Sequence, residues 1–145
     1  KTADVIVVIT AALLVAFFDI SSASLASMVA GIYSDVIPGW IALPAVPIMM
    51  MLLSVIGIHP VITSTTLLAI FSGGGADVHP ALLVQAHLVG WGAGTMSSVA
   101  SLSVLSCATL YRVPTRQLVF GANIISGLGY AVVGGVGLAL INMLI

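Results

Sequence analysis

The sequence predicts an all-α fold: a polytopic bundle of transmembrane helices with a broken helix, for whose N-terminal part a re-entrant hairpin is one of two open arrangements. Of the 145 residues, 61% are hydrophobic and 5% are charged, whereas a soluble domain carries roughly 25% charged residues. The apolar residues also form long runs, such as Trp40–Ile58 and Leu118–Ile145. A membrane β-barrel would show short alternating segments instead, so the runs favour helices.

The few charged residues limit the possible partners and predict the orientation of the chain in the membrane. The net charge is -1, and nucleic-acid binding would require a basic patch, so we expect the lipid bilayer to be the main partner. The single cysteine, Cys107, excludes an internal disulfide. Arg112 and Arg116 share one short loop, which predicts that this loop is cytoplasmic and the C-terminus outside, in a bacterial inner membrane.

We expect residues 1–145 to form a single transmembrane domain. The first apolar run begins close to Lys1, and Asp19 lies where the small residue of a signal-peptide cleavage site would be expected. The chain is therefore interpreted as part of a longer protein. Its partners would be the remainder of that protein or further copies of itself.

Two arrangements are open for the N-terminal part. Val5–Phe18 is shorter than the roughly 20 residues of a span, and it leads into the polar stretch Asp19–Ser27. Residues 19–27 form either the tip of a re-entrant hairpin or the end of one tilted span over residues 3–24. Since an intramembrane carboxylate marks a functional site by default, Asp19 is predicted to bind Na⁺ or a proton, unless it is a solvated helix end.

Prolines and glycines divide the middle of the chain. Trp40–Ile58 is predicted to span the membrane, and Val61–Phe71 to form a short helix. The stretch Ser72–Asp77 is predicted to be a loop, because consecutive glycines destabilise a helix. His59 and His79 each precede a proline, and both are predicted to cap the helix that follows.

The leading candidate for a functional site is Gly90–Ser103. It places three glycines and five hydroxyl side chains inside an apolar block that runs to Leu110. Irregular backbone at membrane depth is tolerated only where it is buried in protein or lines a cavity, and the broken helices of secondary transporters bind their solutes in this way. The alternative is a continuous helix whose small residues let its neighbours approach closely.

The remaining sequence features contribute less to the functional prediction. His87 lies within an apolar helix and is either a satisfied packing histidine or part of a proton relay. No spacing predicts a metal site, a phosphate loop or a serine hydrolase, so we do not expect an enzyme. The last apolar run holds six glycines that predict close helix packing, namely Gly121, Gly127, Gly129, Gly134, Gly135 and Gly137.

Several of these elements occur in a familiar order. The run Gly57-Ile58-His59-Pro60-Val61 opens a helix, the Gly- and Ser-rich break follows, and a loop with Val113-Pro114 leads to a final span. This order resembles the C-terminal part of ion transporter superfamily carriers, which include the large membrane subunits of TRAP dicarboxylate transporters and the sodium/dicarboxylate symporters. The TRAP subunits carry a similar Gly-Ile-acid-Pro-Val. The resemblance implies a preceding re-entrant hairpin and two inverted repeats, of which this chain supplies the second.

The sequence also departs from the pattern of these families. The Ser-Asn-Thr signature of the sodium/dicarboxylate branch is absent, and Ser97-Ser98 stand where TRAP subunits have Pro-Pro. We expect a secondary active transporter, or its C-terminal half, that moves a small organic solute, expected to be an anion, with Na⁺ or H⁺ as the coupling ion and no cofactor. The alternative is a channel-forming or structural subunit of a larger membrane complex. The candidate solute- and ion-binding residues are Asp19, Ser21, Ser22, Ser24, Gly92, Gly94, Thr95, Ser97, Ser98 and Ser101.

Overall fold

The computed structural model describes residues 11, 14, 37–71, 76–99 and 101–145. These residues are mostly helical, as predicted. The alternatives for residues 19–27, and with them the proposed roles of Asp19, Ser21, Ser22 and Ser24, lie outside the described residues.

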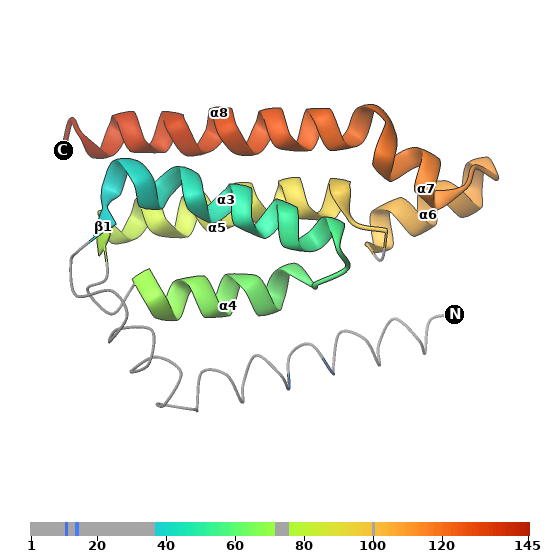
Figure 1. Cartoon of the computed structure of the whole chain (residues 1–145), viewed down its shortest axis with the longest axis horizontal. Helices are drawn as coiled ribbons and strands as arrows, with labels where there is room; N and C mark the ends of the chain where they lie inside the picture. Colours follow the sequence, from blue (N-terminus) through green and yellow to red (C-terminus); the bar gives the residue numbers. More distant parts are fainter. Residues whose placement is uncertain (1–10, 12–13, 15–36, 72–75, 100) are drawn as a thin grey trace.

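The helices lie side by side along the long axis of the molecule (Figure 1). Helix α3 packs against α5 and α8, and α4 packs against α3 and α5. Helices α3 and α5 run in one direction, whereas α4 and α8 run in the other. In chain order the elements are β1 (Ile37–Pro38), α3 (Gly39–Val55), α4 (Pro60–Ile70), β2 (Ala76–Asp77), α5 (Pro80–Ser97), α6 (Leu102–Tyr111), α7 (Thr115–Leu118), the π-helical stretch η2 (Val119–Asn123) and α8 (Ile124–Asn142).

A glycine turn reverses the chain between α3 and α4. Gly57 has a φ of 95°, a left-handed conformation that costs glycine little because it has no Cβ. The N–H of Gly57 donates to the carbonyl of Ser54 (3.1 Å), and that of Ile58 donates to the carbonyl of Leu53 (3.0 Å). This pair of bonds is the Schellman ending of a helix, so α3 ends at Val55, three residues before the end of the predicted Trp40–Ile58 span.

The prediction that two histidines cap helices is confirmed. His59 Nδ1 accepts a hydrogen bond from the Val61 N–H at the start of α4, and His79 Nδ1 accepts one from the Ala81 N–H at the start of α5, both at 3.3 Å. A proline occupies the first helical position in each case, where its missing N–H costs nothing. Both helix starts therefore follow from local sequence.

The prediction of a loop over Ser72–Asp77 is wrong for its last two residues. Ala76–Asp77 pairs in parallel with Ile37–Pro38, so β2 fixes the start of α5 beside the start of α3. The Asn142 side chain near the end of α8 joins them: its Oδ1 accepts from the His79 N–H (3.0 Å) and its Nδ2 donates to the Asp77 carbonyl (3.3 Å). Three distant segments thus meet at one end of the molecule.

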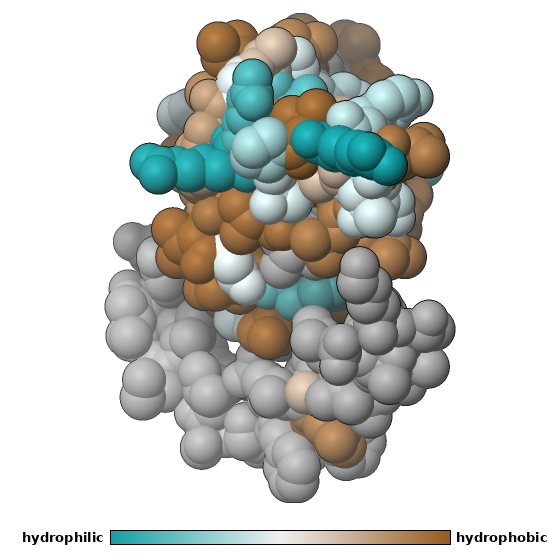
Figure 2. All heavy atoms as spheres, turned by 90° about the vertical axis from the view of Figure 1, so that its right-hand side faces the viewer, coloured by the Kyte–Doolittle hydropathy of each residue, from teal (hydrophilic) through white to brown (hydrophobic). Residues whose placement is uncertain are grey.

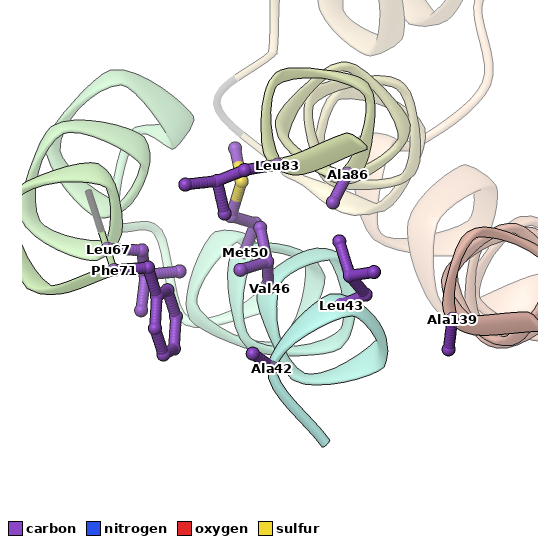
Figure 3. Close-up of a cluster of buried hydrophobic side chains, with 9 residues drawn as sticks. All are labelled: Ala42, Leu43, Val46, Met50, Leu67, Phe71, Leu83, Ala86 and Ala139. Carbon is purple, nitrogen blue, oxygen red and sulfur yellow. The ribbon is translucent and has the colours of Figure 1, made fainter. Parts of the chain in front are cut away.

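The main hydrophobic cluster lies where α3, α4, α5 and α8 converge (Figure 3). Leu43 and Met50 of α3 are fully buried at its centre. Close packing of such side chains accumulates many small dispersion contacts. The cluster consists of Ala42, Leu43, Val46, Met50, Leu67, Phe71, Leu83, Ala86 and Ala139.

Close packing of the glycines in the last apolar run is confirmed for three of the six and wrong for the others. A Cβ at Gly127, Gly134 or Gly135 would meet a neighbouring helix, whereas Gly121, Gly129 and Gly137 face open space. The physical reason is that α8 contacts α3 and α5 along one side only. Gly121 instead marks a kink, with a non-helical ψ of -136°.

Two stretches of the chain, Pro80–Tyr111 and Thr115–Asn142, are long and apolar enough to cross a membrane, judged by length and composition. Less than a third of the most apolar part of each is buried inside the protein. Helices α3 and α4 are apolar but shorter.

Candidate functional site

A helix break separates α5 from α6, as the sequence predicts. Helix α5 ends at Ser97 and α6 begins at Leu102. Ser98 and Ser101 have extended backbone, with ψ of 129° and 141°. Ser101 caps the second helix, because its Oγ accepts from the Val104 N–H at 3.1 Å.

The break is shorter than the predicted range Gly90–Ser103. Gly90, Gly92, Gly94 and Thr95 all lie within α5, and the Thr95 hydroxyl donates to the Gly92 carbonyl (3.0 Å). Before Ser97, the alternative of a continuous helix with small residues at its contacts is therefore correct.

The three glycines of α5 serve helix contacts. A Cβ at Gly90 would lie 2.6 Å from Met50 Sδ, and one at Gly92 would lie 3.2 Å from the Tyr130 ring. A Cβ at Gly94 would lie 2.7 Å from Ser54 Oγ. Each contact is too close or tight for a larger side chain, so these glycines set how near α3 and α8 come to α5.

Two buried serines lie beside the break. Ser97 and Ser54 are both fully buried, and neither hydroxyl has a hydrogen-bond partner in the described part of the chain. Ser54 Oγ packs against Gly94, three residues before Ser97 on α5, and Ser97 Oγ packs against Gly127 of α8. A buried polar atom without a partner is rare and needs an explanation, so the end of α3, the break and α8 form the candidate site.

The remaining predicted residues are placed as follows. Ser98 is buried within the break at 4% exposure, and Ser101 is partly buried at its far side. The structure therefore brings Gly94, Ser97, Ser98 and Ser101 together along one segment.

Sequence reasoning missed Ser54 and Thr63. Both are buried, at 0% and 4% exposure, and the hydroxyl of each lacks a partner among the described residues. A signal for Ser54 was present, since it is the only hydroxyl side chain in the apolar run Trp40–Ile58. Thr63 gives no comparable signal, because hydroxyl residues surround it in the sequence.

The described residues offer no metal centre. No group of three or more His, Cys, Asp or Glu side chains lies close together in residues 37–71, 76–99 and 101–145. Cys107 is exposed on α6. The site therefore offers hydroxyls, backbone groups and helix ends as its polar groups.

No family model, curated protein or solved structure matches this chain. The interpretation of the site consequently depends on its own geometry. The resemblance to ion transporter superfamily carriers stays a prediction from the residues that carry it.

Proposed function

We propose that this protein is an integral membrane protein. The charged side chains of the described residues are Asp77, Arg112 and Arg116. Asp77 belongs to β2 at one end of the long axis, and the two arginines flank the α6–α7 connection at the other (Figure 1). The 28-residue stretch Thr115–Asn142 between these ends is long enough to cross the hydrocarbon core of a bilayer, which excludes charge.

The surface supports the same proposal. Figure 2 looks onto the end that carries the α6–α7 connection, where hydrophilic side chains gather with apolar ones around them. Apolar side chains are exposed along α8, for example Ile125 and Val133, both at 74%. Lipid contact accounts for such exposure, which would cost a water-facing helix much free energy. The positive-inside rule places the arginine end in the cytoplasm of a bacterial cell.

Within the membrane, we propose secondary active transport of a small organic solute. The observation that carries the proposal is the break between Ser97 and Leu102 inside a stretch otherwise long enough to cross the bilayer. Broken backbone in a bilayer must be satisfied by protein, water or a ligand. The buried Ser97 and Ser54 hydroxyls beside it supply neutral donors and acceptors.

The two helix ends at the break favour opposite charges. The start of α6 presents backbone N–H groups and the positive end of its dipole, which favour an anion. The end of α5 presents carbonyl groups and a negative dipole end, which favour a cation such as Na⁺ or a proton. The proposed solute is therefore a small anion, taken up with a cation. The chain would supply the C-terminal half of such a carrier.

The test is uptake by proteoliposomes that contain the full gene product to which this chain belongs. ¹⁴C-labelled lactate, succinate and citrate would be offered with a Na⁺ gradient, a proton gradient or no gradient. We expect gradient-dependent accumulation of at least one. Gradient-independent leak, or no uptake of any probe, would contradict the carrier and leave a channel-forming or structural subunit.

A variant links uptake to the break. Ser97→Ala removes the buried hydroxyl without adding bulk to the tight contact with Gly127. We expect uptake to be lost while the amount of membrane-inserted protein stays the same. Ser106→Ala, on the exposed face of α6, is the matched control and should transport normally.

A further inference from the structure

His87 is only half satisfied. It is buried on α5 at 8% exposure, and its Nδ1 lies 2.8 Å from the Leu83 carbonyl oxygen. A carbonyl oxygen can only accept, so Nδ1 carries the proton of the neutral ring. Nε2 is then left with a free lone pair, and it has no partner among the described residues.

The helical register turns His87 toward the place where α5 meets α3 and α4. Trp91 and Gly94 follow it by four and seven residues on the same face of α5. The Trp91 ring meets the His59 ring edge-on at the start of α4, with centroids 6.2 Å apart, and a Cβ at Gly94 would lie 2.7 Å from Ser54 Oγ of α3 and 3.3 Å from Pro60 of α4. Because α4 and α5 are antiparallel, the following turns of α4 lie beside His87.

Thr63 lies on α4 at the same level as His87 on α5. It lies on the buried stripe between Pro60 and Leu67, while His87 lies between Gly94 and Leu83. Pro60 adjoins Gly94, and Leu67 belongs to the same buried cluster as Leu83. Two buried polar groups, Thr63 Oγ1 and His87 Nε2, therefore lie in one layer between α4 and α5, each without a described partner.

We propose that the coupling ion of the proposed transporter is the proton and that His87 Nε2 binds it. This inference rests on the proposed function. The two atoms are not hydrogen-bonded to each other in this structure. Protonation forms an N–H bond at the Nε2 lone pair and makes the ring a cation, and we expect this new donor to turn toward Thr63 Oγ1, the unpartnered acceptor in the same layer. Loss of the proton restores the lone pair and releases the hydroxyl.

Few other titratable groups face this layer in the described elements. Helix α3 contributes none, α4 contributes His59 at its start, and α8 contributes Tyr130, which faces Gly92. An uncompensated cation is costly in the bilayer, so a solute anion at the break would stabilise it. Ten residues of helix separate His87 from Ser97, about 15 Å. At an effective dielectric constant of about 20, the attraction between the protonated His87 ring and an anion beside Ser97 strengthens binding of the anion about sixfold. The bound anion strengthens binding of the proton by the same factor.

The first test observes the proton directly. ¹⁵N-histidine labelling of the full protein reports the imidazole nitrogens directly, and the signal of His87 is the one that disappears in His87→Gln. We expect the Nε2 signal of His87 to change from the unprotonated to the protonated form as the sample is acidified, and saturating succinate to increase the protonated fraction. An Nε2 that stays unprotonated throughout, with and without succinate, overturns the proposal.

The second test uses uptake. A gradient of about one pH unit can concentrate a solute up to about tenfold when one proton accompanies each molecule. His87→Gln should lose this accumulation but retain exchange of internal for external solute, and Thr63→Val should shift half-maximal uptake to lower pH, because the protonated ring loses its acceptor. His79→Asn, which keeps a capping acceptor, should behave as wild type.

These experiments distinguish a failure of the proton inference from a failure of the proposed transport. If a Na⁺ gradient drives uptake and His87→Gln accumulates solute normally, the proton inference is wrong while the proposed transport stands. If the wild-type protein takes up none of the probes under any gradient, the proposed transport fails instead.

Discussion

Gly127 of α8 lies so close to the Ser97 hydroxyl that a Cβ at this position would overlap Oγ. This contact joins α8, the last helix, to the end of α5 next to the break. It predicts that Gly127→Ala destabilises the protein by about 1–3 kcal/mol, because a methyl group in a packed contact forces its neighbours apart.

Gly129→Ala is the matched control for this change. Gly129 is on the same helix but faces open space, so the alanine should stabilise the helix by up to about 1 kcal/mol. Thermal unfolding in detergent measures both variants. Equal melting temperatures for Gly127→Ala and Gly129→Ala would show that α8 does not pack against Ser97.

A second contact joins α8 to the prolines of α3. A Cβ at Gly135 would lie 2.6 Å from the Pro44 Cα and 3.2 Å from the Leu43 carbonyl oxygen. Pro47 lacks the N–H that would bond this carbonyl in a regular helix. We expect Gly135→Ala to cost more stability than Gly127→Ala, since backbone atoms cannot rotate away as a hydroxyl can. Gly137→Ala, at an open position, should be neutral or stabilising in the same unfolding measurement.

The sequence predicted the helix starts well because they depend on neighbouring residues. A histidine followed by a proline specifies a capped start through local geometry alone, and both His59 and His79 act in this way. The break at Ser98–Ser101 was also foreseen, because several hydroxyl residues interrupt an apolar run.

The sequence alone could not predict which glycines interrupt a helix and which pack against a neighbouring helix. Gly90 and Gly94 would weaken an isolated helix, yet both remain helical where α3 packs against them. The difference between Gly127 and Gly129 likewise depends on which side of α8 meets its neighbours. The buried Ser54 hydroxyl becomes a site residue only because a turn brings the end of α3 beside α5. Such relationships arise from tertiary packing.

The Ser101 cap predicts a change in stability at the break. Ser101→Ala removes the oxygen that accepts from the Val104 N–H, which typically costs about 1 kcal/mol. Ser101→Thr keeps a capping oxygen and should retain most of the stability. Thermal unfolding of the three proteins checks this ranking. A threonine variant as unstable as the alanine variant would show that the hydroxyl does not act as a cap.

The Asn142 side chain predicts coupling between the end of α8 and the start of α5. Asn142→Ala removes its bonds to the His79 N–H and the Asp77 carbonyl, and we expect a loss of about 1–2 kcal/mol. Asn123→Ala, at an exposed asparagine of η2, is the control. Faster hydrogen exchange at Asp77–Ala81 in the first variant alone would confirm the coupling, and unchanged exchange there would contradict it.

The His59 cap predicts a pH dependence. Burial lowers the pKa of His59, which lies outside the two stretches long enough to cross a membrane. Its Nδ1 must be unprotonated to accept from the Val61 N–H. Because the folded-state pKa lies below the unfolded value of about 6.5, the unfolded chain takes up the proton first as the pH falls. Stability should therefore be complete above about pH 7.5 and decline through and below pH 6.5.

His59→Asn separates this effect from other titrations. Asparagine keeps an oxygen that can cap α4 but does not titrate, so the variant should lose less stability than wild type between about pH 7.5 and 5. His79→Asn changes the equivalent cap of α5 and controls for the substitution itself. Unfolding measured across this range by tryptophan fluorescence is a suitable readout, since Trp91 contacts the His59 ring. If the wild-type and His59→Asn proteins decline in parallel, the acid sensitivity arises elsewhere and the cap does not depend on an unprotonated His59.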